Sequence, residues 1–244
     1  MLSINPVKPI KPLITNLAEN DTRKICSFIV PNNKAGELYL DMRMPKAGYG
    51  YGFITELRNS FNKLLGYEEF AFFENSKTIS GLFIRANNEY QRSGYNFGEI
   101  LRLSSIIEIL ENKIKNFNIT SKSSAIYFHS KYKFKPNFTS FAERDKFLDI
   151  LANDKSNGFE KYLQKAQNLI NQIDKNKEPK SQRDCCKQAN SLLGDYLEKV
   201  MAEKSQDKHQ FNYTLGMTLT DENILNNSEF FNNLFEKHGI DYKV

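Results

Sequence analysis

The stretch that decides the fold runs from Thr78 to Ile114 and reads TISGLFIRANNEYQRSGYNFGEILRLSSIIEILENKI. It contains a strand candidate at 78–86, a polar loop at 87–96, and apolar residues that recur at helical spacing. A strand that leads through a loop into a helix gathers backbone N–H groups at the helix start, where the helix dipole favours phosphate. Within the loop, Gly94 lets the backbone approach an anion closely, and Arg92 can supply a charged donor.

The segments before and after this stretch predict more strands and helices. Strands are predicted at 23–30, 37–44 and 115–120, and a hairpin is predicted between 68–74 and 78–86, turning at Asn75-Ser76-Lys77. Amphipathic helices are predicted from Ile54, Leu57, Phe61, Leu64 and Leu65, ended by Gly66, and at 97–114 and 123–132. Alternating strands and helices indicate the α/β (α+β) class, with a mixed central sheet and flanking helices.

The second half of the chain changes character. Helical periodicity at 159–173 and 185–201 predicts an antiparallel helix pair, with Ser181 and Asp184 resembling a capping box. A strand at 210–220 is expected to return to the first sheet, and a final helix is expected at 221–237. The predicted organisation is a Pro-rich lead (1–22), a core (23–138), a helical insertion (139–208), and a last strand and helix that complete the core (209–244).

Charge is unevenly distributed along the chain. The net charge is +5, but residues 1–136 hold 19 Lys and Arg against 12 Asp and Glu, whereas residues 137–244 hold 15 against 17. The positive excess suits a single anionic ligand bound by the first half, although an ordinary solvated surface would show the same count. The lysines are scattered, which argues against a groove for long nucleic acid.

Composition narrows the protein class further. No apolar run approaches the roughly 20 residues of a membrane span, and Pro6, Pro9 and Pro12 interrupt the start where a signal peptide would need an apolar stretch. The three cysteines include no spaced pairs, which argues against a disulfide framework and against a zinc site. We therefore expect a cytoplasmic protein without a metal, and the oligomeric state stays open.

Two motifs in the first half resemble those of the GNAT superfamily of N-acetyltransferases. The family's pyrophosphate loop, Gln/Arg-x-x-Gly-x-Gly/Ala, is similar to Gln91-x-x-Gly94-x-Asn96. The family's later helix motif, Asn-x-x-Ala-x-x-Phe-Tyr-x-Lys-x-Gly-Phe, is similar to Lys122-x-x-Ala125-x-x-Phe128-His129-x-Lys131-x-Lys133-Phe134. The resemblance covers about residues 67–138. It departs from the family at Asn96, Lys122, His129 and Lys133, which stand where the family has Gly or Ala, Asn, Tyr and Gly.

The resemblance implies that acetyl-CoA lies between two parallel strands, here 78–86 and 115–120, and that an amine acceptor attacks the thioester directly. The implied cofactor-binding residues are Ile84, Arg85, Ala86, Gln91, Arg92, Ser93, Gly94, Tyr95, Asn96, Lys122 and Phe128. The resemblance implies that His129 is the general acid that protonates the leaving thiolate, and Tyr132 is the alternative candidate for this role. The base is less defined, with Glu89, Glu74 or an ordered water as candidates.

The sequence also leaves simpler explanations open. Asn96 and Glu99 suit a helix capping box, and His129 suits a packed position on a helix face. The glycine loop at 48–52 is either a substrate-side loop or a plain turn. At the level of function, the alternatives are a GNAT-like domain that has lost turnover and serves as a binding or assembly module, or an unrelated α+β interaction protein.

Overall fold

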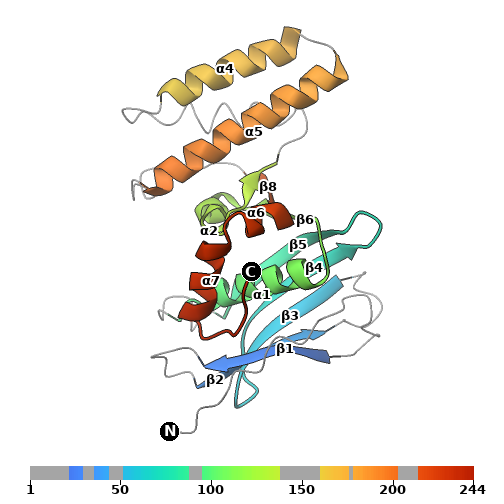
Figure 1. Cartoon of the computed structure of the whole chain (residues 1–244), viewed down its shortest axis with the longest axis vertical. Coiled ribbons are helices and arrows are strands. Elements are labelled where there is room, and N and C mark those ends of the chain that lie inside the picture. Colours follow the sequence, from blue (N-terminus) through green and yellow to red (C-terminus); the bar gives the residue numbers. More distant parts are fainter. Residues whose placement is uncertain are drawn as a thin grey trace. The chain divides into compact units, whose positions relative to one another are not determined.

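The computed structural model describes residues 22–29, 36–43, 52–87, 95–137, 160–175, 178–202 and 214–244. The chain divides into two compact units, one made of residues 1–118 and 219–244 and the other of residues 119–218. Figure 1 labels most elements of the two units. The organisation expected from sequence, with limits at residues 22, 138 and 208, stays a prediction.

The first unit begins with a meander of antiparallel strands. These are β1 (Thr22–Ile29), β2 (Glu37–Arg43), β3 (Gly52–Asn59), β4 (Leu64–Phe73) and β5 (Thr78–Ala86), and each pairs with the next. Successive side chains of β2 point to opposite faces of the sheet. Leu38, Leu40 and Met42 on one face are buried, and the residues between them are half-buried. The predicted hairpin at the turn 74–77 is confirmed.

The helix predicted from Ile54 to Leu65 is wrong, because these residues form the hairpin of β3 and β4. The burial of Phe53, Thr55 and Leu57 follows a period of two, which the larger apolar residues at three- and four-residue spacing concealed. Asn59 closes the turn, since its Oδ1 accepts from the N–H groups of Phe61 at 3.1 Å and Lys63 at 2.9 Å. The spacing in this segment was therefore coincidental rather than helical.

Gly66 does not end a helix either, because it lies inside β4 opposite Ala86. A Cβ at this position would lie 2.7 Å from the carbonyl oxygen of Arg85 and 3.0 Å from Cδ1 of Leu101. Real Cβ atoms do not approach a backbone oxygen so closely. The glycine therefore lets β5 and the overlying helix approach β4.

Helix α1 (Phe97–Glu111) packs against β3, β4 and β5 and is buried along almost its whole length. It leads into β6 (Asn116–Ser121), which neighbours β5 in the sheet. The N–H of Lys115 donates to the carbonyl of Lys77 at 2.7 Å, so β5 and β6 begin side by side. Two neighbouring strands joined by a helix and starting together run parallel, as the family resemblance implied.

The C-terminal segment returns to α1. Strand β8 (Leu215–Thr220) neighbours β6, which confirms the predicted return of the last strand to the sheet. The predicted final helix is broken at residues 226–227 into α6 (Asp221–Leu225) and α7 (Ser228–Lys237), and both contact α1. Thr220 caps α6, since its Oγ1 accepts from the N–H of Asn223 at 3.0 Å. The predicted class, α/β (α+β) with a mixed central sheet and flanking helices, is confirmed, and most of the strand pairs are antiparallel.

The second unit contains the short helices η3 (Ser123–Ala125) and α2 (Ile126–Lys131), the short strand β7 (Lys135–Pro136) and two long helices, α4 (Glu160–Lys175) and α5 (Pro179–Ala202). The long helices lie side by side as predicted (Figure 1). The capping box predicted at Ser181 is wrong, because α5 begins at Pro179, a residue suited to the first helical position. Within the described ranges, no helix combines the length and apolar character that crossing a membrane requires.

Candidate functional site

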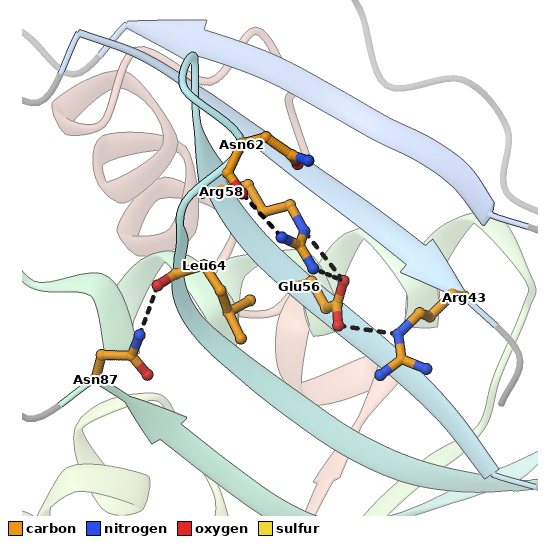
Figure 2. A network of polar contacts seen from close by, with 6 residues as sticks. All are labelled: Arg43, Glu56, Arg58, Asn62, Leu64 and Asn87. Atoms are coloured by element: carbon orange, nitrogen blue, oxygen red, sulfur yellow. Dashed lines mark hydrogen bonds and ion pairs between the residues drawn. The ribbon is translucent and has the colours of Figure 1, made fainter.

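The loop between β5 and α1 is fixed at its first residue. Asn87 donates its backbone N–H to the carbonyl of Leu65 at 2.9 Å and its side-chain Nδ2 to the carbonyl of Leu64 at 2.5 Å (Figure 2). The β5 residues implied in cofactor binding, Ile84–Ala86, lead directly into this anchor. The predicted Glu89, Gln91, Arg92, Ser93 and Gly94 lie outside the described residues, as do residues 48–51 of the glycine loop.

At the other end of the loop, Asn96 turns the chain into α1 through a left-handed conformation, with φ 55° and ψ 37°. Asn is one of the few residues other than glycine that tolerate this conformation. Tyr95 stacks on Phe97 with ring centroids 5.2 Å apart and planes 6° from parallel. The predicted capping box is wrong, since the Asn96 side chain makes no cap hydrogen bond and its carbonyl instead accepts from the N–H groups of Glu99 and Ile100.

The first turn of α1 has the chemistry that suits an anion. Its leading N–H groups and the positive end of the helix dipole face the loop, an arrangement that binds phosphate in proteins. The site residues that the sequence predicted in this unit and that the structure describes therefore flank one loop. They are Ile84, Arg85, Ala86, Tyr95 and Asn96.

Strand β5 carries a β-bulge that the sequence reasoning missed. Glu69 of β4 pairs with Phe83 and Phe70 pairs with Gly81, so Leu82 is an extra residue that pairs with no residue of β4. Leu82 is 63% exposed. A bulge re-aims side chains and backbone groups beside it and is often found next to a functional site. An isolated glycine in a strand pattern, here Gly81, is the signal that could have found it.

A buried polar network lies between α1 and β4. Arg102 Nη1 donates to Glu68 at 2.8 Å and Ser105 Oγ donates to the other carboxylate oxygen at 2.5 Å. The Arg102 guanidinium also lies 5.0 Å from the ring centroid of Phe117 on β6. This network ties α1 to the two strands on either side of β5, and its partners are too far apart in sequence for local patterns to reveal it.

The opposite face of the sheet carries a second network, drawn in Figure 2. Glu56 on β3 accepts from Arg43 Nε at 2.9 Å through one oxygen and from Arg58 Nε and Nη2 at 3.2 and 2.8 Å through the other. Burial alone would raise the pKa of Glu56, but the two arginines outweigh it and hold the pKa below its usual value. This carboxylate is therefore a structural anion rather than a base for catalysis.

In the second unit, α2 brings three of the predicted residues together. The Phe128 ring makes edge contacts with His129 and Tyr132, at centroid distances of 5.2 and 5.0 Å. His129 is 6% exposed and Tyr132 is 2% exposed, whereas Lys122 is exposed at the N-cap of η3. The acid role predicted for His129 or Tyr132 thus falls on residues that pack in an aromatic cluster.

Helix α2 ends in the arrangement typical of a left-handed C-terminal residue. Lys133 has φ 66°, the N–H of Lys133 donates to the carbonyl of Ser130 at 3.0 Å, and the N–H of Phe134 donates to the carbonyl of His129 at 3.2 Å. These two hydrogen bonds form a Schellman motif, whose left-handed residue is usually glycine. Lys133 thus adopts a backbone conformation that favours glycine, the residue that the motif pattern has at this position.

The candidate residues fall into two groups, one in each unit. Of the two carboxylates proposed as a base, Glu89 lies outside the described residues and Glu74 is exposed in the β4–β5 turn. Among the residues that the structure describes, no group of three or more His, Cys, Asp or Glu is arranged to hold a metal ion.

Solved structures similar to this chain include many GNAT-family acetyltransferases. Tetrahymena GCN5 matches at 14% identity over 38% of this chain and 57% of its own, with a TM-score of 0.34. A GNAT-family acetyltransferase from Elizabethkingia anophelis with acetyl-CoA bound matches at 19% identity over 36% and 57%, with a TM-score of 0.32. The spermidine/spermine N-acetyltransferase SpeG from Vibrio cholerae matches at 10% identity over 74% and 72%, with a TM-score of 0.39.

The chain spans little more than half the length of the first two of these structures. No protein-family model matches it, and no curated protein matches its sequence.

Proposed function

We propose that this protein is an acyl-CoA-dependent N-acetyltransferase that moves an acetyl group from acetyl-CoA to a primary amine. The observation that carries the proposal is the strand–loop–helix unit of the first half, in which the bulged β5 leads through the anchored loop to the left-handed Asn96 and the buried α1. This geometry supports a phosphate site at the loop, and the bulge at Leu82 interrupts the pairing of β5 with β4.

Under this proposal, residues 91–96 bind the pyrophosphate and the backbone of residues 84–86 binds the pantetheine and the acetyl carbonyl. Acetyl-CoA supplies the activated acyl group. The amine nitrogen forms a bond with the acyl carbon while the carbon–sulfur bond breaks, a base takes the proton of the nitrogen, and an acid protonates the thiolate. His129 or Tyr132 is the proposed acid, and Glu89 or an ordered water is the proposed base. A cytoplasmic location is part of the proposal.

A second candidate is a GNAT-like domain that binds CoA without turnover and serves in assembly. The burial of both proposed acids favours it, because neither ring is open to a reacting thiolate. His129 packs against Phe128 and Phe134, and Tyr132 packs against Phe128. The third hypothesis, an unrelated interaction protein, predicts no parallel strand pair beside the loop. Strands β5 and β6 are connected by α1 and begin side by side, and this arrangement counts against the third hypothesis.

The test is calorimetric titration with CoA and acetyl-CoA, followed by an assay of thiol release over a panel of polyamines, amino acids and peptides. Arg92→Glu should weaken CoA binding, since it reverses a charge in the proposed pyrophosphate loop. Lys113→Glu is the matched control, because Lys113 is exposed at the far end of α1. Absence of binding at millimolar CoA would overturn both CoA-dependent candidates, and binding without transfer would select the second.

A further inference from the structure

The first turn of α1 carries a carboxylate that is buried and held by two residues from the end of the chain. Glu99 Oε1 accepts from Lys237 Nζ at 2.5 Å and contacts His238 Nε2 at 2.6 Å. The Glu99 side chain is 3% exposed and the His238 side chain is 2% exposed. Lys237 is the last residue of α7 and His238 is its C-cap. The C-terminal end of α7 therefore meets the N-terminal turn of α1.

A carboxylate at this position has two consequences for an anion site. It interacts favourably with the positive end of the α1 dipole, but the same interaction makes it a competitor of any phosphate that binds there. A buried carboxylate also needs partners, because desolvation of an unpaired charge is costly. Lys237 and His238 supply those partners and keep the carboxylate in the interior of the unit, so that the turn can accept another anion.

The His238 ring has its orientation set by this contact. Its Nδ1 is buried and has no hydrogen-bond partner within the described part of the chain. Among the residues that the structure describes, the contact with Glu99 is thus the one polar interaction of the His238 side chain. Such a ring is held by packing and by a single carboxylate, which makes the Glu99–His238 contact sensitive to loss of either residue.

We propose that Glu99, Lys237 and His238 form a clamp through which the end of α7 fixes the first turn of α1 in its phosphate-binding arrangement. This inference rests on the proposed function. Glu99, Lys237 and His238 act as positioning residues: they hold the backbone of the first turn, which the N–H groups of Glu99 and Ile100 close by donating to the carbonyl of Asn96. They take no part in the chemical step.

The chain offers a matched control at the other end of the same helix. Tyr242 donates its hydroxyl to Glu111 Oε1 at 3.1 Å, at the last residue of α1. Burial, followed by the nearby carboxylates Glu111 and Glu108, raises the pKa of Tyr242 above its ordinary range, so the hydroxyl stays a donor. Tyr242→Phe removes one contact between the same C-terminal segment and α1, but far from the loop.

The first measurement is CoA affinity by calorimetry in the full-length chain. The clamp predicts that Lys237→Met/His238→Ala raises the Kd for CoA about tenfold, whereas Tyr242→Phe leaves it within about twofold. His238→Gln, which keeps a donor near Glu99, should recover most of the affinity when Lys237 is retained. Equal losses of affinity in the clamp and control variants would show that the contacts only stabilise the fold, and would overturn the proposal.

The second measurement does not depend on CoA. Hydrogen–deuterium exchange of the Glu99 and Ile100 amides should be at least several-fold faster in the Lys237→Met/His238→Ala variant than in the unmodified chain. In Tyr242→Phe the acceleration should fall on the last turn of α1 instead. Unchanged exchange at Glu99 and Ile100 would overturn the clamp. If the unmodified chain binds no CoA, the proposed function fails, and exchange alone still decides whether the first turn is held by α7.

Discussion

The Arg102 guanidinium on α1 and the Glu68 carboxylate on β4 form a 2.8 Å ion pair that is buried on both sides. Ser105 donates to the same carboxylate. Burial raises the pKa of Glu68, while Arg102 and Ser105 favour its charged form. An ion pair so placed adds little net stability compared with apolar packing, but it fixes which part of α1 faces β4. The helix that begins at the proposed phosphate site is thus held at its middle by a specific polar contact.

Removal of one partner should be far more harmful than replacement of both. Arg102→Met is expected to lower the free energy of unfolding by about 3–5 kcal/mol, because it leaves the Glu68 carboxylate buried without its counter-ion. The double variant Arg102→Met/Glu68→Leu should recover most of that loss. Urea unfolding of the two variants measures the difference. A double variant as unstable as the single one would mean that lost packing, rather than an unpaired charge, causes the damage.

Local sequence patterns predicted the parts of the fold that local physics decides. The hairpin at 74–77, helix α1 and the long helix pair each carry a clear period or turn signal. The β3–β4 hairpin was mistaken for a helix because Leu57, Phe61 and Leu64 happen to lie at helical spacing. The cross-strand pairs that decide its structure, such as Leu57 with Gly66, are contacts between strands that no local window contains.

The site shows the same division. The residues of the strand–loop–helix unit followed from the motif, but the Glu68–Arg102 and Glu99–His238 contacts join residues separated by 34 and 139 positions. No spacing rule links residues so distant in sequence. The departures at Asn96 and Lys133 are also explained only by backbone angles, since both residues adopt positive φ. The sequence shows that each residue differs from the motif pattern, whereas φ shows that the backbone adopts a conformation that suits glycine.

Replacement of Lys133 by glycine should therefore increase the stability of the folded protein. The left-handed conformation costs an L-residue about 1–2 kcal/mol, and the greater freedom of glycine in the unfolded chain returns about 0.5–1 kcal/mol of that. We expect Lys133→Gly to raise the free energy of unfolding by about 0.5–1 kcal/mol and the melting temperature by about 2 °C. The control is Lys131→Gly at the last residue of α2, which should destabilise by up to about 0.5–1 kcal/mol, the cost of glycine in a helix. Destabilisation by both substitutions, measured by thermal unfolding, would contradict a strained Lys133.

Glu56 should make the stability of the sheet depend on pH. Its pKa in the folded chain lies below the ordinary value of 4.5, so the stabilisation that it receives from Arg43 and Arg58 is present above the unfolded-state pKa and is lost as pH falls through the folded-state pKa. Glu56→Gln should lower the free energy of unfolding at pH 7 by about 1 kcal/mol, because both arginines are partly exposed. At a pH below the folded-state pKa the two proteins should differ much less. A difference that is the same at both pH values, in matched urea titrations, would argue against the ion pairs as its source.

Gly66 gives the sharpest test of how closely β5 and α1 must approach β4. Gly66→Ala places a Cβ 2.7 Å from the carbonyl oxygen of Arg85, so β5 must move away at the strand end that leads into the loop. We expect a loss of about 2–3 kcal/mol in the free energy of unfolding, as for other overpacked sites. Under the proposed function, CoA affinity should fall as well, since Arg85 and Ala86 are displaced.

The matched control for Gly66 is Gly52 at the start of β3, where a Cβ would meet its nearest neighbour, the carbonyl oxygen of Phe70, at an ordinary 3.7 Å. Gly52→Ala should change the free energy of unfolding by less than about 1 kcal/mol, because an added methyl in ordinary contact requires no strand movement. Urea unfolding and calorimetric titration with CoA on both variants measure the two effects separately. If the Gly66→Ala and Gly52→Ala variants were equally stable, β4 and β5 could accommodate the added methyl group, and their close approach would not be required. If it lost stability but bound CoA normally, the end of β5 would not contribute to the CoA site.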